Sequence, residues 1–237
     1  MNIAILLSGG TGTRLGADLP KQYIRVADRM IITYSLSVLM EHSQIDGIVI
    51  VAEEEWREII LSDLKQCGQN TEKIIGFAVP GVTRQFSILN ALNYITYEWN
   101  TETATTNILI HDAARPNLSS DMVSQCMDTL KEHEGVMPVL PMKDTIYESK
   151  DGMTVTNLLD RSHLFAGQAP EGFRFDLYYE ANKKLLPDSL YKINGATEPA
   201  ILAGMDIAMI PGDENNYKIT TQADLERFRE NMERNNR

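Results

Sequence analysis

Cysteine is scarce in this sequence: among 237 residues only Cys67 and Cys126 are cysteines, and they lie far apart. No Cys-x-x-Cys pair is present, so the spacing suggests neither a disulfide framework nor a cysteine-based zinc cluster. We therefore expect two ordinary buried thiols.

Long hydrophobic runs are also missing. The apolar start of the chain, MNIAILL, meets Gly9 and Gly10 before the hydrophobic region of a signal peptide could be completed. No other stretch approaches the length that a membrane span requires. We therefore expect a cytoplasmic protein that has no membrane partner.

Positive charge is in short supply. The sequence has 22 Lys and Arg residues against 33 Asp and Glu residues, which gives a formal net charge of -11. An acidic surface repels nucleic-acid backbones and anionic membranes, so neither is an expected partner. A small molecule or another protein is the expected partner instead.

The sequence does contain a regular alternation of strand-like and helix-like segments. Its length fits one large α/β domain or two small ones, and 43% hydrophobic residues can form a sizeable core. The alternation predicts βαβ crossovers, hence a doubly wound, mostly parallel, Rossmann-like sheet in a single domain over residues 1–237. Apolar runs of strand length occupy residues 2–9, 46–54, 73–81 and 105–116, and helical spacing occupies residues 30–42, 54–66 and 84–95.

Three polar stretches each follow one of these predicted strands: SGGTGTR (8–14), PGVTRQFS (80–87) and HDAARP (111–116). In open α/β sheets, ligands bind at the carboxyl ends of the strands. We therefore predict that the three stretches form one shared site.

The first of these stretches belongs to a glycine-rich loop, LLSGGTGTRLGADLPKQY (6–23). Glycines let the backbone approach a ligand, and Arg14 and Lys21 indicate that the ligand is anionic, so phosphate is expected. A Walker A loop is excluded because Lys21 has no preceding glycine and is followed by Gln22. A nucleoside triphosphate held for transfer at its α-phosphorus fits the two cations well.

A nicotinamide-dependent oxidoreductase is the competing class. Its fingerprint needs a third glycine where this chain has Leu15, and an acidic residue after the second strand, a role that Glu53 or Glu54 could fill. The missing glycine argues against this class.

Several motifs in fixed order resemble the cytidylyltransferases that act on methylerythritol phosphate or ribitol phosphate. They are GGTGTRLG followed by LPKQY, then HDAARP, then the Asp160-Arg161 pair, then NYKITTQADL near the end. The resemblance covers nearly the whole chain. It implies a nucleotide-diphospho-sugar transferase fold and Mg²⁺-dependent transfer of CMP from CTP to a small phosphorylated alcohol, with release of pyrophosphate. It also implies a role in isoprenoid, teichoic-acid or capsule biosynthesis.

The resemblance implies that Arg14, Lys21 and Lys218 are catalytic. Arg14 and Lys21 would hold the triphosphate, and Lys218 would reach the α-phosphate from the last predicted strand. An acceptor phosphate is already deprotonated at neutral pH, so the reaction requires alignment and charge neutralisation rather than a general base.

The resemblance also implies a nucleotide-binding set. Gly81 would let the backbone approach the base, Arg84 would orient its loop, and Ser87 would cap the following helix while facing the pyrimidine. Asp112 would lie on the nucleotide and metal side, as the Mg²⁺ ligand, whereas His111 is expected to be structural. The full set is Ser8, Gly9, Gly10, Thr11, Gly12, Gly81, Arg84, Ser87 and Asp112.

A predicted β-hairpin over residues 141–161 interrupts the helix–strand pattern. It alternates polar with apolar residues, and Lys150, Asp151 and Gly152 supply turn chemistry. Composition leaves open whether its apolar side packs on its own domain or on a partner subunit. The resemblance implies a homodimer through this arm, in which Thr145 and Arg161 bind the acceptor phosphate.

Two further residues belong to the implied acceptor side, which is also where the chain departs most from the family pattern. Arg115 would support the loop and the acceptor. Asn194 and Gly195 replace the usual Thr-Asp pair, so Glu198 could compensate, or it could simply cap a helix that begins near Thr197.

A second departure lies on the nucleotide side, where Val82 replaces an expected acidic residue. Because of these departures, two alternatives stay open: the same chemistry on a different phosphate or phosphonate acceptor, and a catalytically silent nucleotide-binding protein.

Overall fold

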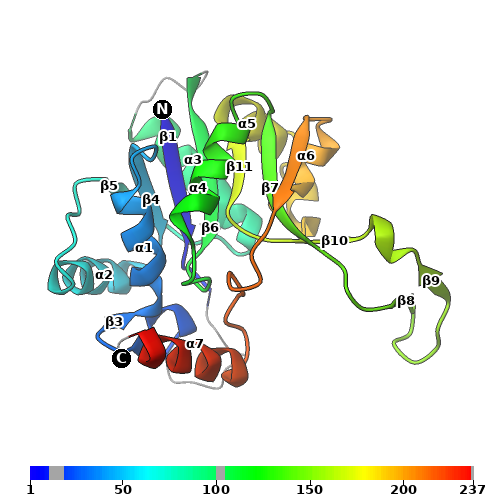
Figure 1. The fold of residues 1–237 in the computed structure, drawn as a ribbon. Coiled ribbons are helices and arrows are strands. Elements are labelled where there is room, and N and C mark those ends of the chain that lie inside the picture. Colours follow the sequence, from blue (N-terminus) through cyan, green and yellow to red (C-terminus); the bar gives the residue numbers. More distant parts are fainter. Residues whose placement is uncertain (11–18, 100–104, 236–237) are drawn as a thin grey trace.

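The structure is a computed structural model that describes residues 1–10, 19–99 and 105–235. In this part of the chain, the central sheet has eight strands (Figure 1). They are β1 (Asn2–Leu7), β4 (Gly47–Val51), β5 (Ile74–Ala78), β6 (Asn107–Asp112), β7 (Gly135–Pro141), β10 (Phe165–Gly167), β11 (Glu171–Arg174) and β12 (Ile207–Pro211).

The strand order around β1 creates a switch point. Strands β5, β4, β1, β6, β11 and β7 are hydrogen-bonded in that order, and β10 and β12 also pair with β7. β4 and β6 both run parallel to β1, on opposite sides of it. β11 is antiparallel to β6 and β7, and β10 is antiparallel to β7. The predicted mostly parallel sheet is thus confirmed, with two reversed strands that the sequence pattern did not indicate.

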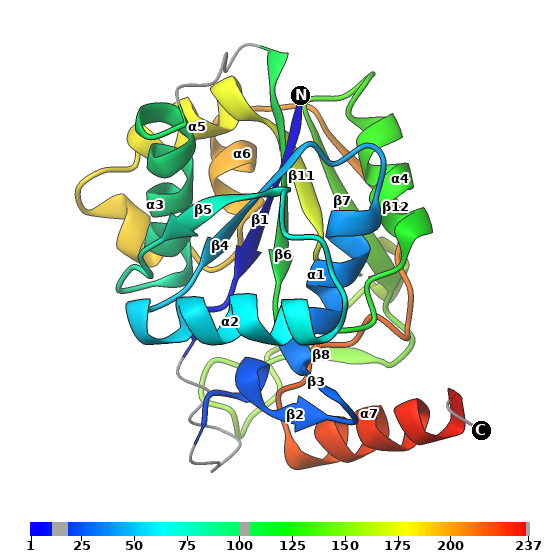
Figure 2. The same cartoon turned by 90° about the vertical axis from the view of Figure 1, so that its left-hand side faces the viewer.

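Helices cover both faces of the sheet (Figure 2). Apolar residues of α1 (Ile31–Glu41), α2 (Glu54–Gln66) and α4 (Ser120–Thr129) belong to one core cluster. Those of α3 (Arg84–Tyr97), α5 (Phe175–Lys183) and α6 (Glu198–Leu202) belong to the other. The doubly wound architecture is confirmed.

The central strands are apolar throughout because both of their faces are buried. Along β1, Ala4 and Leu6 belong to one core cluster, and Ile3 and Ile5 belong to the other. Alternating side chains of a strand point to opposite faces, so a strand covered on both sides reads as a continuous apolar run. The register places Leu7, the last residue of β1, beside Val51 and Asp112. The loops after β1 and β6 therefore start side by side.

A small third cluster joins the segment after the phosphate loop to the C-terminal helix. The 3-10 turn η2 (Lys21–Tyr23) leads into a short hairpin of β2 (Arg25–Val26) and β3 (Arg29–Met30). α7 (Gln222–Asn235) packs against this hairpin. The cluster consists of Val26, Ile31, Ile219, Leu225 and Phe228.

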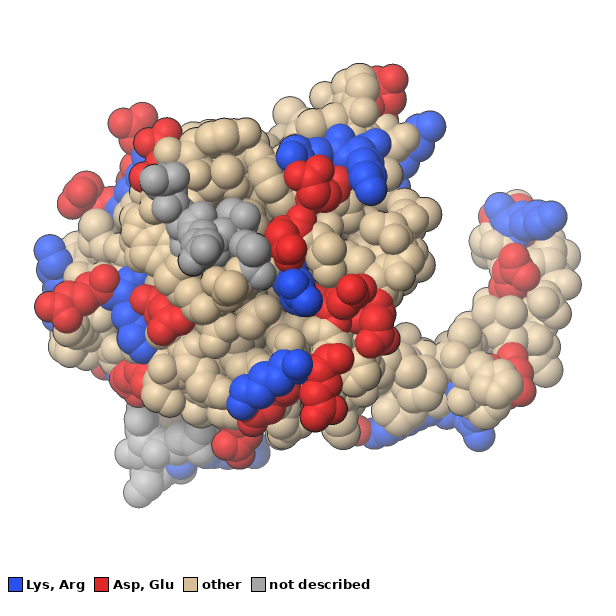
Figure 3. Space-filling model, turned by 90° about the horizontal axis from the view of Figure 1, so that it is seen from above, with Lys and Arg blue, Asp and Glu red and all other residues tan. Residues whose placement is uncertain are grey.

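The predicted hairpin arm is present. β8 (Ile146–Glu148) and β9 (Asn157–Leu159) pair antiparallel, and the arm projects from the body of the molecule (Figures 1 and 3). In the turn, the Asp151 carboxylate accepts the N–H groups of Met153 and Thr154 at 2.9 and 2.7 Å. Gly152 has φ +73°, a conformation that glycine adopts without strain. The turn chemistry assigned to residues 150–152 is thereby confirmed.

Both cysteine thiols are free, and Cys126 is buried, where burial raises its pKa to about 12. None of the helices in residues 1–10, 19–99 and 105–235 has the length and apolar character needed to cross a bilayer.

Candidate active site

The three polar stretches meet at one cavity of about 440 Å³ beyond the carboxyl ends of the central strands. This confirms the prediction of a shared location, which rested on the topology of parallel sheets. The cavity is lined by Leu7, Ser8, Gly9, Gly10, Lys21, Gln22, Gly81, Val82, Thr83, Arg84, Ser87, Asp112, Ala114 and Lys218.

The loop after β1 forms one wall of this cavity. The buried Ser8 hydroxyl donates to Val51 O at 2.6 Å and so fastens the loop to the end of β4. A Cβ on Gly9 would lie 2.5 Å from Pro80 Cβ, so only glycine lets this wall approach the loop after β5 so closely. Thr11, Gly12 and Arg14 lie outside the described residues.

The turn before α3 forms a second wall. Gly81 N donates to the Ser87 hydroxyl at 2.9 Å, and that hydroxyl donates to Thr83 O at 3.0 Å. A Cβ on Gly81 would lie 2.4 Å from Phe86 Cβ, so glycine is required for the turn to fold back on the helix. The expectation that Ser87 caps α3 is wrong. Thr83 is the N-cap and accepts the N–H of Phe86, whereas Ser87 lies one turn further on and holds Gly81.

Asp112, the last residue of β6, is surrounded by cations. Its carboxylate lies 3.2 Å from Arg84 Nη2, 3.0 Å from Lys218 Nζ and 3.7 Å from Arg115 Nε. Burial alone would raise the pKa of Asp112, but the three cations outweigh burial and hold that pKa well below its usual range. The carboxylate is therefore ionised and organises the positive charge of the site.

Glu171 also belongs to this network, although it is not among the predicted site residues. Its Oε2 lies 3.1 Å from Arg84 Nη2, and its Oε1 accepts the Thr197 hydroxyl at 2.8 Å. Arg84 thus lies between two carboxylates. Burial would lower the pKa of Arg84, but Asp112 and Glu171 raise it. Glu171 is the only acidic residue in the stretch GQAPEGF (167–173), which has no spacing that indicates a site.

Lys218 reaches the cavity from an irregular segment, so its predicted placement on the last strand is wrong. The last strand, β12, ends before it, and α7 begins after it. The segment is held instead by the loop after β6. Ile219 N donates to Ala114 O at 2.8 Å, and Arg115 Nη1 donates to Asn216 O at 2.6 Å. The N–H of Ile219 and the carbonyl of Asn216 are thus bonded to the loop after β6 and are not paired with a neighbouring strand.

His111 is fully buried behind Asp112. Its Nε2 lies 3.0 Å from Arg115 O, so this nitrogen donates to the carbonyl and helps to fix the turn. Burial lowers the pKa of His111 to about 4, and the ring is neutral near pH 7. These contacts match the structural role that was expected of it.

The remaining predicted acceptor residues do not line this cavity. Thr145 and Arg161 lie on the exposed arm, where Arg161 Nη1 donates to Lys143 O at 2.5 Å. Glu198 begins α6 as predicted, and its Oε2 accepts the N–H of Asn194 at 2.8 Å. Within one chain, the described members of the predicted nucleotide-binding set therefore meet at this cavity, and most of the predicted acceptor residues lie apart from it.

Among the described residues that line this cavity, Asp112 is the one carboxylate that a magnesium ion could use. Among the described residues, no three His, Cys, Asp or Glu side chains are grouped so that they could hold a metal. Mg²⁺ is usually bound through one or two carboxylates together with substrate phosphates and water. The Asp112 carboxylate, which lies at the cavity, fits that pattern.

A protein-family model described as IspD, 2-C-methyl-D-erythritol 4-phosphate cytidylyltransferase, matches residues 2–234. The chain belongs to the IspD family. This IspD-family chain is 32% identical over 228 residues to the 2-C-methyl-D-erythritol 4-phosphate cytidylyltransferase of Thermotoga neapolitana, covering 95% of the chain and 94% of that relative.

Two bifunctional relatives are longer than this IspD-family chain. It is 33% identical to the bifunctional enzyme IspD/IspF of Paramagnetospirillum magneticum, with 96% of the chain matched but only 56% of that relative. It is 28% identical to the bifunctional ribulose 5-phosphate reductase/CDP-ribitol pyrophosphorylase Bcs1 of Haemophilus influenzae, with 94% of the chain and 46% of that relative matched.

The fold of this IspD-family chain matches a crystal structure of 4-diphosphocytidyl-2C-methyl-D-erythritol synthase from Anaerococcus prevotii. The TM-score is 0.81 at 22% identity, over 98% of this chain and 96% of that one. Family membership makes the protein a cytidylyltransferase, a nucleotidyltransferase, and decides against the nicotinamide-dependent alternative.

Proposed function

We propose that this cytidylyltransferase transfers CMP from CTP to a small phosphorylated polyol, with methylerythritol phosphate as the first candidate and ribitol phosphate as the second. The observation that carries the proposal is the single cavity in which the loops after β1, β5 and β6 meet Lys21 and Lys218. The two candidate acceptors follow from the relatives, which include both methylerythritol-phosphate and CDP-ribitol enzymes. Residues 1–237 would act as one domain, and a cytoplasmic location stays a prediction.

In the proposed reaction an acceptor phosphate oxygen attacks the α-phosphorus of CTP. A new P–O bond forms there as the bond to the β-phosphate oxygen breaks, and pyrophosphate leaves with the electron pair. No proton has to move, so the protein needs to align two polyanions and neutralise their charge. Lys21, Lys218 and Arg14 would supply the positive charge, and the backbone of Ser8–Gly10 would line the phosphates.

When it is bound, Mg²⁺ would supply positive charge beside the phosphates of the substrates. Asp112 would be its protein ligand. Because Asp112 already contacts Lys218 at 3.0 Å, the amine would have to turn from the carboxylate toward the phosphates. Lys218 would then exchange one anionic partner, the Asp112 carboxylate, for another, a phosphate. The carboxylate would thereby be released for the metal.

The arm of residues 141–161 would form a homodimer and complete the acceptor site. Its side chains include large apolar groups that solvent reaches, with Met153 89% exposed and Tyr147, Val155 and Leu158 also exposed. Apolar surface of this kind on a projecting hairpin favours burial against a partner. Thr145 and Arg161, which are apart from the cavity of their own chain, would bind the acceptor phosphate at the partner's cavity.

The dimer proposal is tested by deleting the hairpin tip, residues 149–155, and comparing sedimentation and kinetics with the wild type. We expect monomers that still bind CTP and have lost acceptor binding. A wild-type protein that sediments as a monomer at micromolar concentration and is fully active contradicts the proposal.

The reaction itself is tested by measuring pyrophosphate release from each of the four nucleoside triphosphates with methylerythritol phosphate or ribitol phosphate, with Mg²⁺ and with EDTA. We expect release from CTP with one of the two acceptors, and loss of release in EDTA. Activity only with another phosphate or a phosphonate would change the acceptor assignment. The replacement of family residues by Val82 and Gly195 would then explain the different acceptor. CTP binding without release under any condition would favour a silent nucleotide-binding protein.

A further inference from the structure

Gln22 lies beside Lys21 in η2, and its amide joins the two ends of the phosphate loop. The residue is 3% exposed. Its Nε2 donates to Ser8 O and, at 2.8 Å, to Gly10 O. Both carbonyls belong to the wall that follows β1, whereas Lys21 lies on the opposite end of the loop and lines the same cavity.

The neighbouring Tyr23 reinforces this connection. Its hydroxyl donates to Ser8 O at 3.1 Å, so that carbonyl accepts two side chains from η2. The Tyr23 ring stacks on Trp56 of α2, with centroids 4.0 Å apart and an interplanar angle of 13°. η2 is thereby fixed both to the end of β1 and to the helix that covers the sheet.

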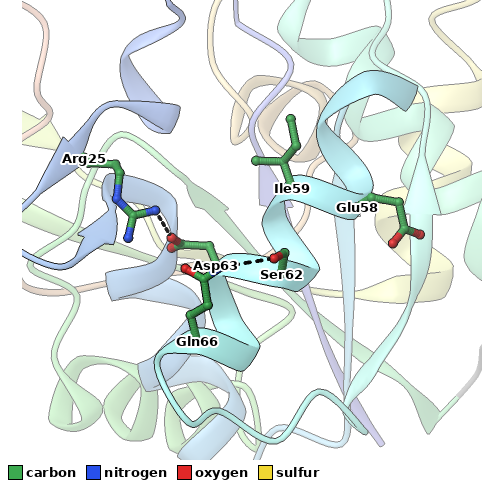
Figure 4. A pocket seen from close by; sticks show the side chains of 6 residues that line it. All are labelled: Arg25, Glu58, Ile59, Ser62, Asp63 and Gln66. Atoms are coloured by element: carbon green, nitrogen blue, oxygen red, sulfur yellow. Dashed lines mark hydrogen bonds and ion pairs between the residues drawn. The ribbon is translucent and has the colours of Figure 1, made fainter.

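The chain after η2 is fixed to the same helix. Asp63 of α2 is buried, and its carboxylate pairs with Arg25 (Figure 4). The same carboxylate accepts the N–H of Met30 at 3.0 Å and the hydroxyl of Thr33 at 2.5 Å. The chain that follows Gln22 is therefore held against α2 by contacts of the Asp63 carboxylate.

We propose that Gln22 is a positioning residue that sets Lys21 against the backbone of Ser8–Gly10. The inference rests on the proposed function, in which Lys21 neutralises phosphate charge. The chemistry requires an amide: two carbonyl oxygens converge on one nitrogen, and a neutral NH₂ group satisfies both without burying a charge. A carboxylate at this position would set negative charge against both carbonyls.

The test compares Gln22→Glu, which keeps the shape and loses both donors, with Gln22→Met, which loses them without adding charge. We expect kcat for pyrophosphate release to fall by about 100-fold in Gln22→Glu, because a displacement of about 1 Å has that effect on an aligned reaction. The KM for CTP should change far less. Gln125→Glu on α4, an exposed glutamine, is the matched control and should behave as the wild type.

A double-mutant cycle with Lys21→Ala separates positioning from a merely structural role. If Gln22 acts through Lys21, Gln22→Glu should lower kcat by less than about threefold once Lys21 is absent, because directly coupled residues are not additive. All variants are assayed well below their unfolding temperatures. If Gln22→Glu does not fold, Gln22→Met takes its place in the same cycle.

The outcomes distinguish this inference from the proposed function. A wild type that releases no pyrophosphate under any condition overturns the proposed function. An active wild type in which Gln22→Glu and Gln22→Met both turn over within threefold of normal overturns the positioning role alone. The same holds if the loss is equally large with and without Lys21.

Discussion

Replacing Asp112 by Asn should destabilise the protein strongly, because it removes the negative charge that holds three cations together. The nearest two, Lys218 Nζ and Arg84 Nη2, lie 3.0 and 3.2 Å from the carboxylate. At an effective dielectric constant of about 20, each such pair has a gross attraction of about 5 kcal/mol. Desolvation offsets much of that attraction.

The expected net effect is a loss of about 3–5 kcal/mol in the free energy of unfolding, as is typical when one partner of a buried ion pair is removed. For a chain of this size the midpoint of thermal unfolding should fall by about 6–20 °C. Added pyrophosphate should raise the midpoint more in the variant than in the wild type, because the freed cations gain an anion.

The assay is chemical and thermal denaturation at pH 7.5, with and without pyrophosphate. Asp128→Asn is the control: Asp128 contacts Lys131 at 2.7 Å, but both side chains are exposed, so its stability should be unchanged within error. An Asp112→Asn protein within about 1 kcal/mol of the wild type would refute the view that this carboxylate organises the site.

Three other predictions concern His111, the two lysines of the cavity, and Glu198 at the start of α6. The pKa of His111 is depressed to about 4 in the folded state, so between about pH 6.5 and 4 only the unfolded chain takes up the proton, and stability should fall by about 3 kcal/mol as pH is lowered through that window. His111→Gln should flatten this dependence in urea unfolding; an unchanged pH profile would contradict it. Lys218→Ala or Lys21→Ala should lower kcat by a factor of about 10²–10³, measured by pyrophosphate release, while circular dichroism should show an intact fold. Wild-type-like turnover in both variants would remove these lysines from the mechanism. Glu198→Gln should raise the KM of the acceptor and leave CTP binding unchanged, if the carboxylate oxygen not bonded to Asn194 accepts an acceptor hydroxyl. Unchanged acceptor kinetics would leave Glu198 only its structural contact with the Asn194 N–H.

The sequence predicted the features that depend on local pattern and on topology. α2 was expected over residues 54–66 and has those bounds, because its apolar spacing and its glutamate-rich start agree. The common location of the loops after β1, β5 and β6 followed from parallel strand order alone. Position within a family motif identified Lys218 as a site residue, even though its predicted strand is absent.

The features that sequence reasoning missed depend on contacts between distant segments. Glu171 meets Arg84 across 87 positions, and an isolated glutamate in GQAPEGF has no spacing that indicates such a partner. The family resemblance implied that Ser87 caps α3, but Thr83 is the N-cap, because its hydroxyl lies at the position that accepts the N–H of Phe86. The role of Gln22 depends on the folding back of η2 onto β1, which no periodicity reports.

The projecting arm implies that two inactive variants, one defective in the cavity and one defective in the arm, could restore activity when they are mixed. In the proposed dimer, Lys21 and Arg161 of one chain serve different active sites, so a Lys21→Ala chain still offers an intact arm and an Arg161→Ala chain still offers an intact cavity. After the two inactive proteins are mixed and allowed to exchange subunits, about half of the dimers are hybrids, each with one complete site and one doubly defective site. Activity should then recover to about a quarter of the wild-type level, a form of subunit complementation that an enzyme with its whole site in one chain could not display.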